Sequence, residues 1–286
     1  PGGVGSGSAT VSAGYGPGGG FGSSNQNIDC VNPPPPDDIA GGGGGYGGKG
    51  GKGYYDFSYS TYGLEGGPIY GDSVNPQNAS DTVDRYGNLV PAIFGSGGAG
   101  GIHEHCPLFD HDHNYYTGGS GGGSVIIYAQ SVIIRYDTVG LNQAGIWANG
   151  TDGVDAENSG GSGGGSGGLI YIKTDYFNSS YLGMPNAFGK HGGEDGTVWV
   201  KDPAQINFYG GNSITAKGGQ GNNLYRQDFP YGSGGGGGGR VVIDAPLTLD
   251  GGSLEPTSQM IKVEVKWSEG AREEKVELKT LLKDVR

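Results

Sequence analysis

The chain lacks the long apolar runs and the excess of positive charge that mark several common classes of protein. No stretch of about 18 consecutive apolar residues occurs in its 286 residues, so the sequence predicts no membrane-spanning helix and no direct membrane insertion. Asp and Glu outnumber Lys and Arg by 29 to 17, which gives a formal net charge of −12. Because nucleic acids and anionic membranes bind through Lys and Arg, neither is an expected partner.

Sequence patterns of common catalytic sites are also missing. No glycine run is followed by Lys-Ser or Lys-Thr at the start of a helix, which excludes a P-loop for phosphate. No Gly-x-Ser-x-Gly stands between a credible strand and a helix, and no pair of carboxylates is typical of a glycosidase. We therefore predict that the protein is not an enzyme.

Cysteine is scarce, with only Cys30 and Cys106 in the chain. One disulfide between them would suit an oxidising compartment. Three Asn-x-Ser/Thr sequons, at Asn78, Asn149 and Asn178, are compatible with a glycosylated surface. These features predict an extracellular or cell-surface location. Because the sequence begins with Pro1 and shows no signal-like segment, we expect a processed or truncated product.

Glycine is the residue that the chain has in abundance, with 66 copies that fall mainly in long runs between short apolar strands. Glycine adds no side chain to a core and loses the most conformational freedom on folding, so such a chain must pack backbone against backbone. The 18 Tyr and the β-branched runs argue against disorder. The predicted fold is all-β, with stacked short strands that are β-solenoid-like, polyglycine II helices, or both.

Composition divides the chain into four regions. They are a Gly/Pro-rich segment at 1–53, an aromatic and His-rich excursion at 54–117, Gly-rich strand repeats at 118–253 and a C-terminal β-hairpin docking module at 254–286. In the first region, Gly47 to Gly53 repeat every three residues, which is the period of a polyglycine or polyproline II helix. Such helices have no internal hydrogen bonds, so they need neighbours that satisfy their backbone.

A short strand after a glycine run recurs in the third region. It occurs at Ser124–Ala129, Leu169–Thr174, Thr197–Asp202 and Arg240–Ala245. A second element recurs inside two of these units, at 145–150 and 213–219. This recurrence predicts stacked turns, each of which buries the face of its neighbour.

The C-terminal region carries an amphipathic pattern with a period of two, which predicts a β-hairpin with one apolar face. An amphipathic hairpin must dock on another surface, so we assign docking or assembly to its apolar residues. These are Ile261, Val263, Val265, Trp267, Val276, Leu278 and Leu282.

The run Gly160-Gly-Ser-Gly-Gly-Gly-Ser-Gly-Gly168 leads into Leu-Ile-Tyr-Ile, and Gly234 to Gly239 lead into Arg-Val-Val-Ile. This part of the chain resembles secreted bacterial Gly-rich repeat proteins of β-solenoid character. It is also similar to the Gly-rich adhesins at the tips of some phage tail fibres, which have layered polyglycine II helices. The resemblance implies a scaffold whose loops carry recognition.

The tail Ile261-Lys-Val-Glu-Val-Lys-Trp267, a charged turn and Lys275-Val-Glu-Leu-Lys-Thr-Leu-Leu282 resemble the C-terminal strands of type IV pilin-like proteins. In that family a long apolar N-terminal helix forms the filament core, and this sequence has none. The resemblance therefore implies that the helix has been cleaved off or that a separate pilin-like helical subunit supplies it.

A segment rich in His and Asp is the candidate metal site. Imidazole and carboxylate together suit Zn, Cu, Ni or Fe, and His-x-His places both residues on one side of a strand. The candidate ligands are His103, His105, His111, His113, Asp110 and Asp112. The alternative is a solvated loop with Cys106 bridged to Cys30. Asn149, Asp152, Asp155 and Glu157 could bind Ca²⁺, although a plain polar turn is favoured there.

The sequence supports two functions. The first is a non-enzymatic structural subunit of an extracellular filament, self-assembling, adhesive and related to type IV pili, whose partners are copies of itself or a pilin-like helical subunit. The second is a phage-fibre or cell-surface adhesin that binds a host, surface or glycan ligand. Its contacts would lie in 54–117, 175–196 and 220–233. The aromatic residues of the first range could stack on sugars or on a partner subunit, although filling of the core is favoured; they are Tyr54, Tyr55, Phe57, Tyr59 and Tyr62. A metal-dependent enzyme is a remote third hypothesis.

Overall fold

The structure is a computed structural model. It describes residues 5–6, 10–11, 13–22, 38–53, 56–57, 60–61, 64–71, 82–83, 89–90, 93–105, 112–134, 145–154, 161–178, 185–190, 192–201, 214–221, 225–226, 229–230, 232–245, 259–269 and 272–282. These residues form strands and extended glycine-rich segments and contain no helix, so the all-β prediction is confirmed for them. Nothing in the described ranges could therefore cross a membrane as a helix.

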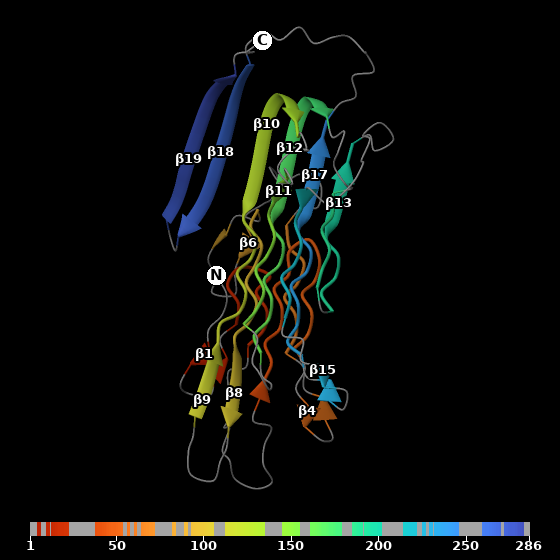
Figure 1. The fold of residues 1–286 in the computed structure, drawn as a ribbon. Helices are drawn as coiled ribbons and strands as arrows, with labels where there is room; N and C mark the ends of the chain where they lie inside the picture. Colours follow the sequence, from red (N-terminus) through yellow and green to blue (C-terminus); the bar gives the residue numbers. More distant parts are fainter. Residues whose placement is uncertain are drawn as a thin grey trace, which may run out of the picture.

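The largest sheet has the strand order β13-β17-β12-β10-β18-β19 and lies at one end of the molecule (Figure 1). Its strands are β10 (Ser124–Ile133), β12 (Leu169–Asn178), β13 (Thr197–Val200), β17 (Arg240–Asp244), β18 (Gln259–Glu269) and β19 (Arg272–Leu282). β10, β12, β17 and β13 are parallel neighbours, and their first residues lie opposite one another. The four strands that recur in the sequence are therefore side by side in the fold.

The remaining strands form small sheets. β11 (Ile146–Trp147) and β14 (Ile214–Thr215) pair in parallel, so the second recurring element also pairs with its own copy. β3 (Asp38–Ile39), β8 (Gly101–His105) and β9 (Asp112–Tyr116) form an antiparallel sheet. The two-stranded pairs are β1 (Gly5–Ser6) with β2 (Thr10–Val11), β4 (Asp56–Phe57) with β5 (Ser60–Thr61), β6 (Thr82–Val83) with β7 (Leu89–Val90), and β15 (Tyr225–Arg226) with β16 (Phe229–Pro230).

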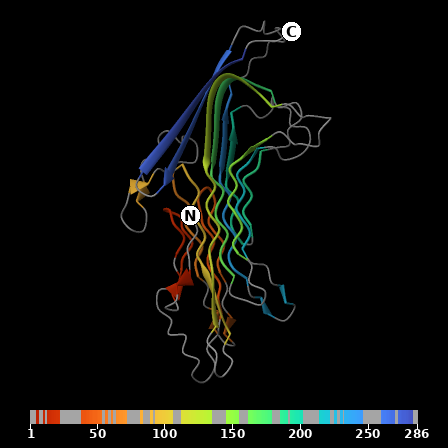
Figure 2. The ribbon, with the colours of Figure 1, turned by 60° about the vertical axis from the view of Figure 1, so that its left-hand side comes forward.

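Parallel strands need long return connections, which in most proteins are helices. Here much of the return path consists of extended glycine-rich segments that run side by side below the large sheet (Figures 1 and 2). We call them the glycine bundle. It comprises residues 13–22, 40–53, 64–71, 93–100, 117–123, 145–154, 161–168, 185–190, 192–196, 214–221 and 232–239.

Residues 161–168 form the central segment of this bundle, and their hydrogen bonds rotate among several neighbours. From Ser162 to Gly167, the N–H groups donate in turn to residues of segments 145–154, 93–100 and 232–239, and then repeat that order. The accepting carbonyls are those of Val154, Ala99, Gly234, Thr151, Ser96 and Gly237, at 2.9–3.3 Å. The carbonyls of the central segment accept from segments 40–53, 117–123 and 214–221. A β-strand would bond only to neighbours in one plane, so this rotation distinguishes the bundle from a sheet.

The same three-residue period positions side chains on the bundle surface. Lys49 and Lys52 stand three residues apart, and both ammonium groups contact the carboxylate of Glu65, at 3.5 and 2.5 Å. The hydrogen bond from Lys52 lowers the pKa of Glu65. Because all three side chains are about half exposed, this triad orders the surface and adds little stability.

Close packing explains why the bundle needs glycine. A Cβ atom placed on Gly163 would lie 2.1 Å from the carbonyl oxygen of Gly42, and one on Gly167 would lie 2.0 Å from that of Ala216. Real Cβ atoms do not approach an oxygen so closely. The segments therefore touch through their backbones, and the requirement at these positions is for space.

The core lies on both faces of the parallel strands, as expected for a parallel sheet. One face packs Ile170, Ile172, Val241 and Ile243 against small and aliphatic residues of the bundle, Ala148, Ile214 and Ala216. We call it the aliphatic face. The other face packs Leu169, Tyr171 and Val242 against Tyr46 and Tyr70.

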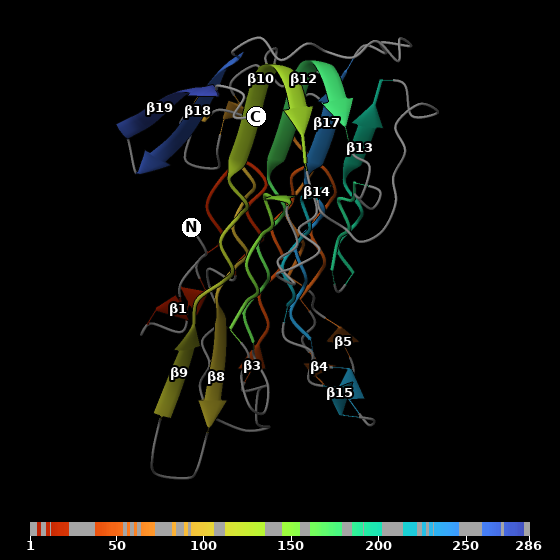
Figure 3. The same cartoon turned by 45° about the horizontal axis from the view of Figure 1, so that its top comes forward.

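Small hairpins lie at the end of the bundle far from the large sheet (Figure 3). They are β1–β2, β4–β5, β15–β16 and the β3–β8–β9 sheet, which come from distant parts of the sequence. β18 and β19 leave the main sheet at an angle (Figure 2). The molecule therefore has a sheet end and a hairpin end.

Candidate functional site

The His-rich segment lies on β8 and β9 at the hairpin end. The antiparallel register places His105 opposite Asp112 and Glu104 opposite His113. Because successive residues of a strand alternate between faces, His105 and Asp112 share one face with His103, whereas His113 falls on the other. The predicted ligands on these two strands are thus divided between two faces.

Two of the predicted ligands, Asp110 and His111, lie outside the described residues. In the part of the chain that the structure describes, no three His, Cys, Asp or Glu side chains gather around a possible metal ion. The metal site stays a prediction. The disulfide also stays one, because Cys30 and Cys106 lie outside the described ranges.

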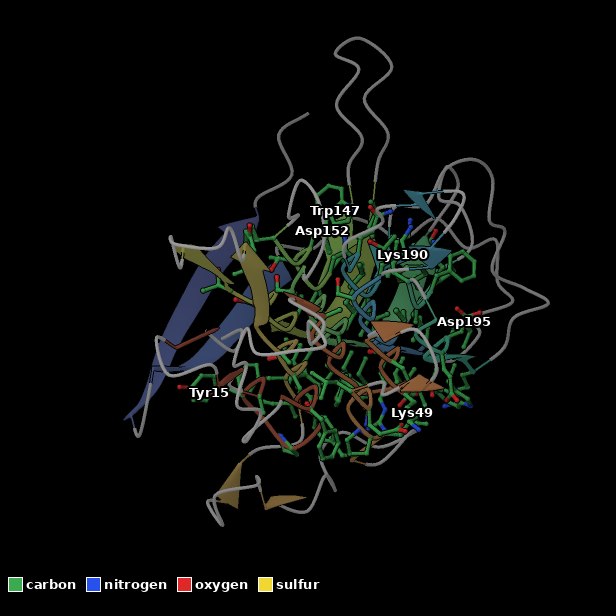
Figure 4. All side chains as sticks on the ribbon, turned by 90° about the horizontal axis from the view of Figure 1, so that it is seen from below. Tyr15, Lys49, Trp147, Asp152, Lys190 and Asp195 are labelled. Carbon is green, nitrogen blue, oxygen red and sulfur yellow. The ribbon has the colours of Figure 1, made fainter. Side chains whose placement is uncertain are left out.

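Asn149 and Asp152 hydrogen-bond to the backbone of a neighbouring segment. Asn149 Oδ1 accepts from Thr215 Oγ1 and from the N–H of Lys217, both at 2.8 Å. Asp152 Oδ1 accepts from the N–H of Gln220 at 2.6 Å. These two side chains therefore tie segment 145–154 to segment 214–221 at the bundle surface, where Figure 4 labels Asp152.

The structure says less about the remaining candidate Ca²⁺ ligands and the remaining sequons. Asp155 and Glu157, the other candidate Ca²⁺ ligands, lie outside the described residues. Of the sequons, Asn78 lies outside them too, and Asn178 ends β12 opposite Ile133. Glycosylation remains a prediction at all three sites.

A buried polar cluster joins the large sheet to the bundle. Arg240, at the start of β17, is 2% exposed, and its guanidinium carbon lies 4.7 Å from the centre of the Tyr46 ring. Its Nη2 donates to the carbonyl oxygens of Tyr70, at 2.5 Å, and Gly71, at 3.0 Å. The rings of Tyr46 and Tyr70 are 5.0 Å apart. The guanidinium thus binds carbonyl oxygens and a ring face in a dry environment.

Hydroxyl groups extend this cluster into the bundle. The Tyr70 hydroxyl donates to the carbonyl of Phe94 and accepts from Ser96 Oγ, which lies 2.9 Å away. Ser96 Oγ also accepts from the N–H of Gly18 at 3.0 Å, while the N–H of Ser96 donates to Ser166 Oγ at 2.8 Å. These bonds tie the segments 13–22, 64–71, 93–100 and 161–168 together, which indicates a structural role.

This cluster predicts loss of stability at alkaline pH. Burial raises the pKa of Tyr46 to about 12, against the opposing effect of Arg240, and burial also raises the pKa of Tyr70. A group whose folded pKa is raised contributes stability below its unfolded pKa, about 10 for tyrosine, and loses it as the pH rises toward the folded value. We therefore expect the free energy of unfolding to fall between pH 10 and about 12.

Tyrosinate absorbance and circular dichroism, measured together against pH, test this expectation. Between pH 10 and about 12, the free energy of unfolding of the variant Tyr46→Phe should fall by about 2 kcal/mol less than that of the wild type. Ionisation of Tyr46 near pH 10 in the folded protein would contradict the prediction.

A cavity of about 350 Å³ lies beside β13, at the outer flank of the sheet. Its lining is mainly apolar, with Phe188 51% exposed and Val198 40% exposed. Asp195 lies at its rim, where Oδ1 accepts from the N–H of Gly189 at 3.0 Å and holds the surrounding loop. Asn186 also lines the cavity, and its enclosed amide has no hydrogen-bond partner. The full lining is Pro185, Asn186, Ala187, Phe188, Asp195, Gly196 and Val198.

The predicted docking residues share one face of β18 and β19. The register places Val263 opposite Leu278 and Val265 opposite Val276, and Ile261 and Trp267 alternate in phase with them. Leu282 is opposite Gln259 and falls on the same face. β18 pairs with β10 so that Val263 lies opposite Ile127, which packs against the core of the aliphatic face.

Known proteins offer no guide to these features. The chain matches no known family, curated protein or solved structure.

The cavity and the Arg240 cluster were not predicted from the sequence. Arg240 follows directly on a glycine run and begins a β-branched strand, which is the one local signal that marks it. Nothing local marks the cavity, because residues 185–188 and 195–198 meet only in the folded chain.

Proposed function

We propose that the protein is a non-enzymatic, self-assembling structural subunit of an extracellular filament related to type IV pili. The observation that carries the proposal is the end of the large sheet. Its last strand, β19, runs from Arg272 to Leu282, and no strand of the described part of the chain pairs with its outer edge. A long strand at a sheet edge is a ready template for pairing with another chain.

The glycine bundle supplies the rigid body of such a subunit. Its three-residue hydrogen-bond rotation supports polyglycine II helices, and the parallel stacking of β10, β12, β17 and β13 supports a solenoid-like return of the chain. Hydrogen bonds then link each interior segment to neighbours on all sides, without side chains. This arrangement suits a load-bearing filament better than a flexible surface coat.

The C-terminal strands have the features of a docking element. β18 pairs with β19 along its whole length, but it pairs with β10 only through Lys262 to Glu264. Most of the hairpin is thus held by its own two strands. We propose that its apolar residues dock on a neighbouring copy or on a pilin-like helical subunit.

Substitution on the two faces of β18 tests this docking role. We expect Val265→Asp, and deletion of 259–282, to abolish filament formation while the glycine bundle stays folded, because both remove the apolar contact. Lys266→Ala, one residue away on the charged face, should assemble like the wild type. Electron microscopy and sedimentation measure the outcome, with circular dichroism as the control for folding. Filaments that survive the deletion would refute the assignment.

A surface adhesin is the second candidate, and the position of the hairpins favours it. The β8–β9, β4–β5 and β15–β16 pairs come from distant parts of the sequence but gather at the end opposite the large sheet (Figure 3). Recognition usually resides in such loops on a rigid scaffold. The same microscopy separates the two functions, because an adhesin would form isolated particles or a single density at a fibre tip.

A further inference from the structure

We propose that β19 of one copy adds to β13 of the next, so that the large sheet continues from subunit to subunit. This inference rests on the self-assembly proposed above and identifies the surface that accepts the hairpin. β13 and β19 are the two terminal strands of the same sheet, and among the described residues neither has a second neighbouring strand. A repeated contact between two different edges builds an open-ended chain of subunits, as a filament requires, when the rotation between copies does not close a ring.

The strand directions agree with this arrangement. β13, β17, β12 and β10 are parallel, β18 is antiparallel to β10, and β19 is antiparallel to β18. β19 therefore runs in the same direction as β13. A second copy displaced along the sheet, without reversal, would add its β19 as a parallel neighbour of β13.

The faces of the sheet also agree. Val198 lies opposite Val241, and Val200 lies opposite Ile243, so both belong to the aliphatic face. At the other end of the sheet, Val263 lies opposite Ile127 on that same face. Cross-strand neighbours share a face, so a continued sheet brings the apolar positions of β19 onto the side where Val198 lines the cavity.

The cavity gives this contact its specificity. β13 is short, running from Thr197 to Val200, so backbone pairing alone would be weak and poorly selective. Phe188 and Val198 leave an exposed apolar opening beside it. An apolar residue of β19, Val276 or Leu278, is of the size and chemistry that such a cavity accepts, and its burial would fix the register of the added strand.

One donor variant and two acceptor variants test the proposal. Leu278→Asp damages only β19, and Phe188→Asp damages only the cavity. Phe188 is half exposed outside any strand, so its substitution should leave the fold intact. Val198→Asp is a second acceptor variant. Tyr15→Asp is the matched control, because Tyr15 is 46% exposed and Figure 4 shows it on the opposite flank from Asp195.

Sedimentation and electron microscopy should show filaments for the wild type and for Tyr15→Asp. Each of the other variants should stay folded and monomeric, with association weakened at least about tenfold. An equimolar mixture of Leu278→Asp and Phe188→Asp should form dimers that do not grow, because only one intact β19 can meet one intact cavity.

Two results would overturn this inference alone. Filaments of both acceptor variants, with none from Leu278→Asp, would show that β19 docks elsewhere while self-assembly stands. A mixture that stays monomeric would exclude two separate complementary surfaces. If the wild-type protein does not self-associate, the proposed function fails as well.

Discussion

Replacement of Gly164 by alanine should destabilise the protein by about 3 kcal/mol or more. A Cβ atom at this position would lie 2.2 Å from the carbonyl oxygen of Gly219, a backbone atom of a neighbouring segment. Its own N–H also donates to the carbonyl of Gly234 at 3.0 Å. The two neighbours cannot move apart without lengthening hydrogen bonds on both sides, so the cost spreads through the bundle.

Gly123→Ala is the matched control. A Cβ atom there would meet nothing within 4 Å, and the residue is exposed. Alanine restricts the unfolded chain more than glycine does, so we expect this variant to be more stable by about 0.5 kcal/mol. Denaturant unfolding of both variants gives the comparison. Equal stabilities of Gly164→Ala and Gly123→Ala would show that close backbone packing does not require glycine at position 164.

Arg240→Met should cost about 3 kcal/mol of stability. Methionine fills much of the space, but it leaves the buried carbonyl of Tyr70 and the carbonyl of Gly71 without the donor that the guanidinium provides. The contact between the positive charge and the Tyr46 ring is lost as well. The stability of Arg240→Lys should fall between that of the wild type and that of Arg240→Met, because an ammonium group keeps the charge but loses the planar, multiply donating guanidinium.

Lys201→Met is the control for a generic loss of charge. Lys201 Nζ lies 3.2 Å from Asp244 Oδ1, but its side chain is 45% exposed. Exposed ion pairs contribute little, so this change should cost less than about 1 kcal/mol. Thermal and denaturant unfolding followed by circular dichroism measure both. A smaller loss in Arg240→Met than in Lys201→Met would contradict the structural role of the cluster.

The elements that sequence analysis located best are those with a local pattern. Runs such as Val125 to Ile127 and Val241 to Ile243 are rich in β-branched residues after a glycine run, and both lie in parallel strands of the large sheet. The alternation at 261–267 likewise falls within β18. Strand propensity and periodicity are properties of a few consecutive residues, so they can be recognised from the sequence without the fold.

The features that sequence analysis did not locate depend on contacts between distant segments. Asn149 and Asp152 read as a polar turn or a Ca²⁺ site, yet their oxygens accept hydrogen bonds from residues almost 70 positions away. The guanidinium of Arg240 reaches the carbonyl of Tyr70 across 170 residues of sequence. No local rule pairs such residues.

The sequence by itself determined the all-β class, the positions of the recurring strands and the need for backbone-to-backbone packing, because composition and short-range periodicity encode them. Only the tertiary structure decided which glycine segments are neighbours, which faces of the β8–β9 pair carry His103, His105 and His113, and which described strands end the large sheet. The reason is physical. Glycine runs are nearly identical and carry no side chains to specify a partner, so a segment finds its neighbours only when the whole bundle forms its backbone hydrogen bonds together.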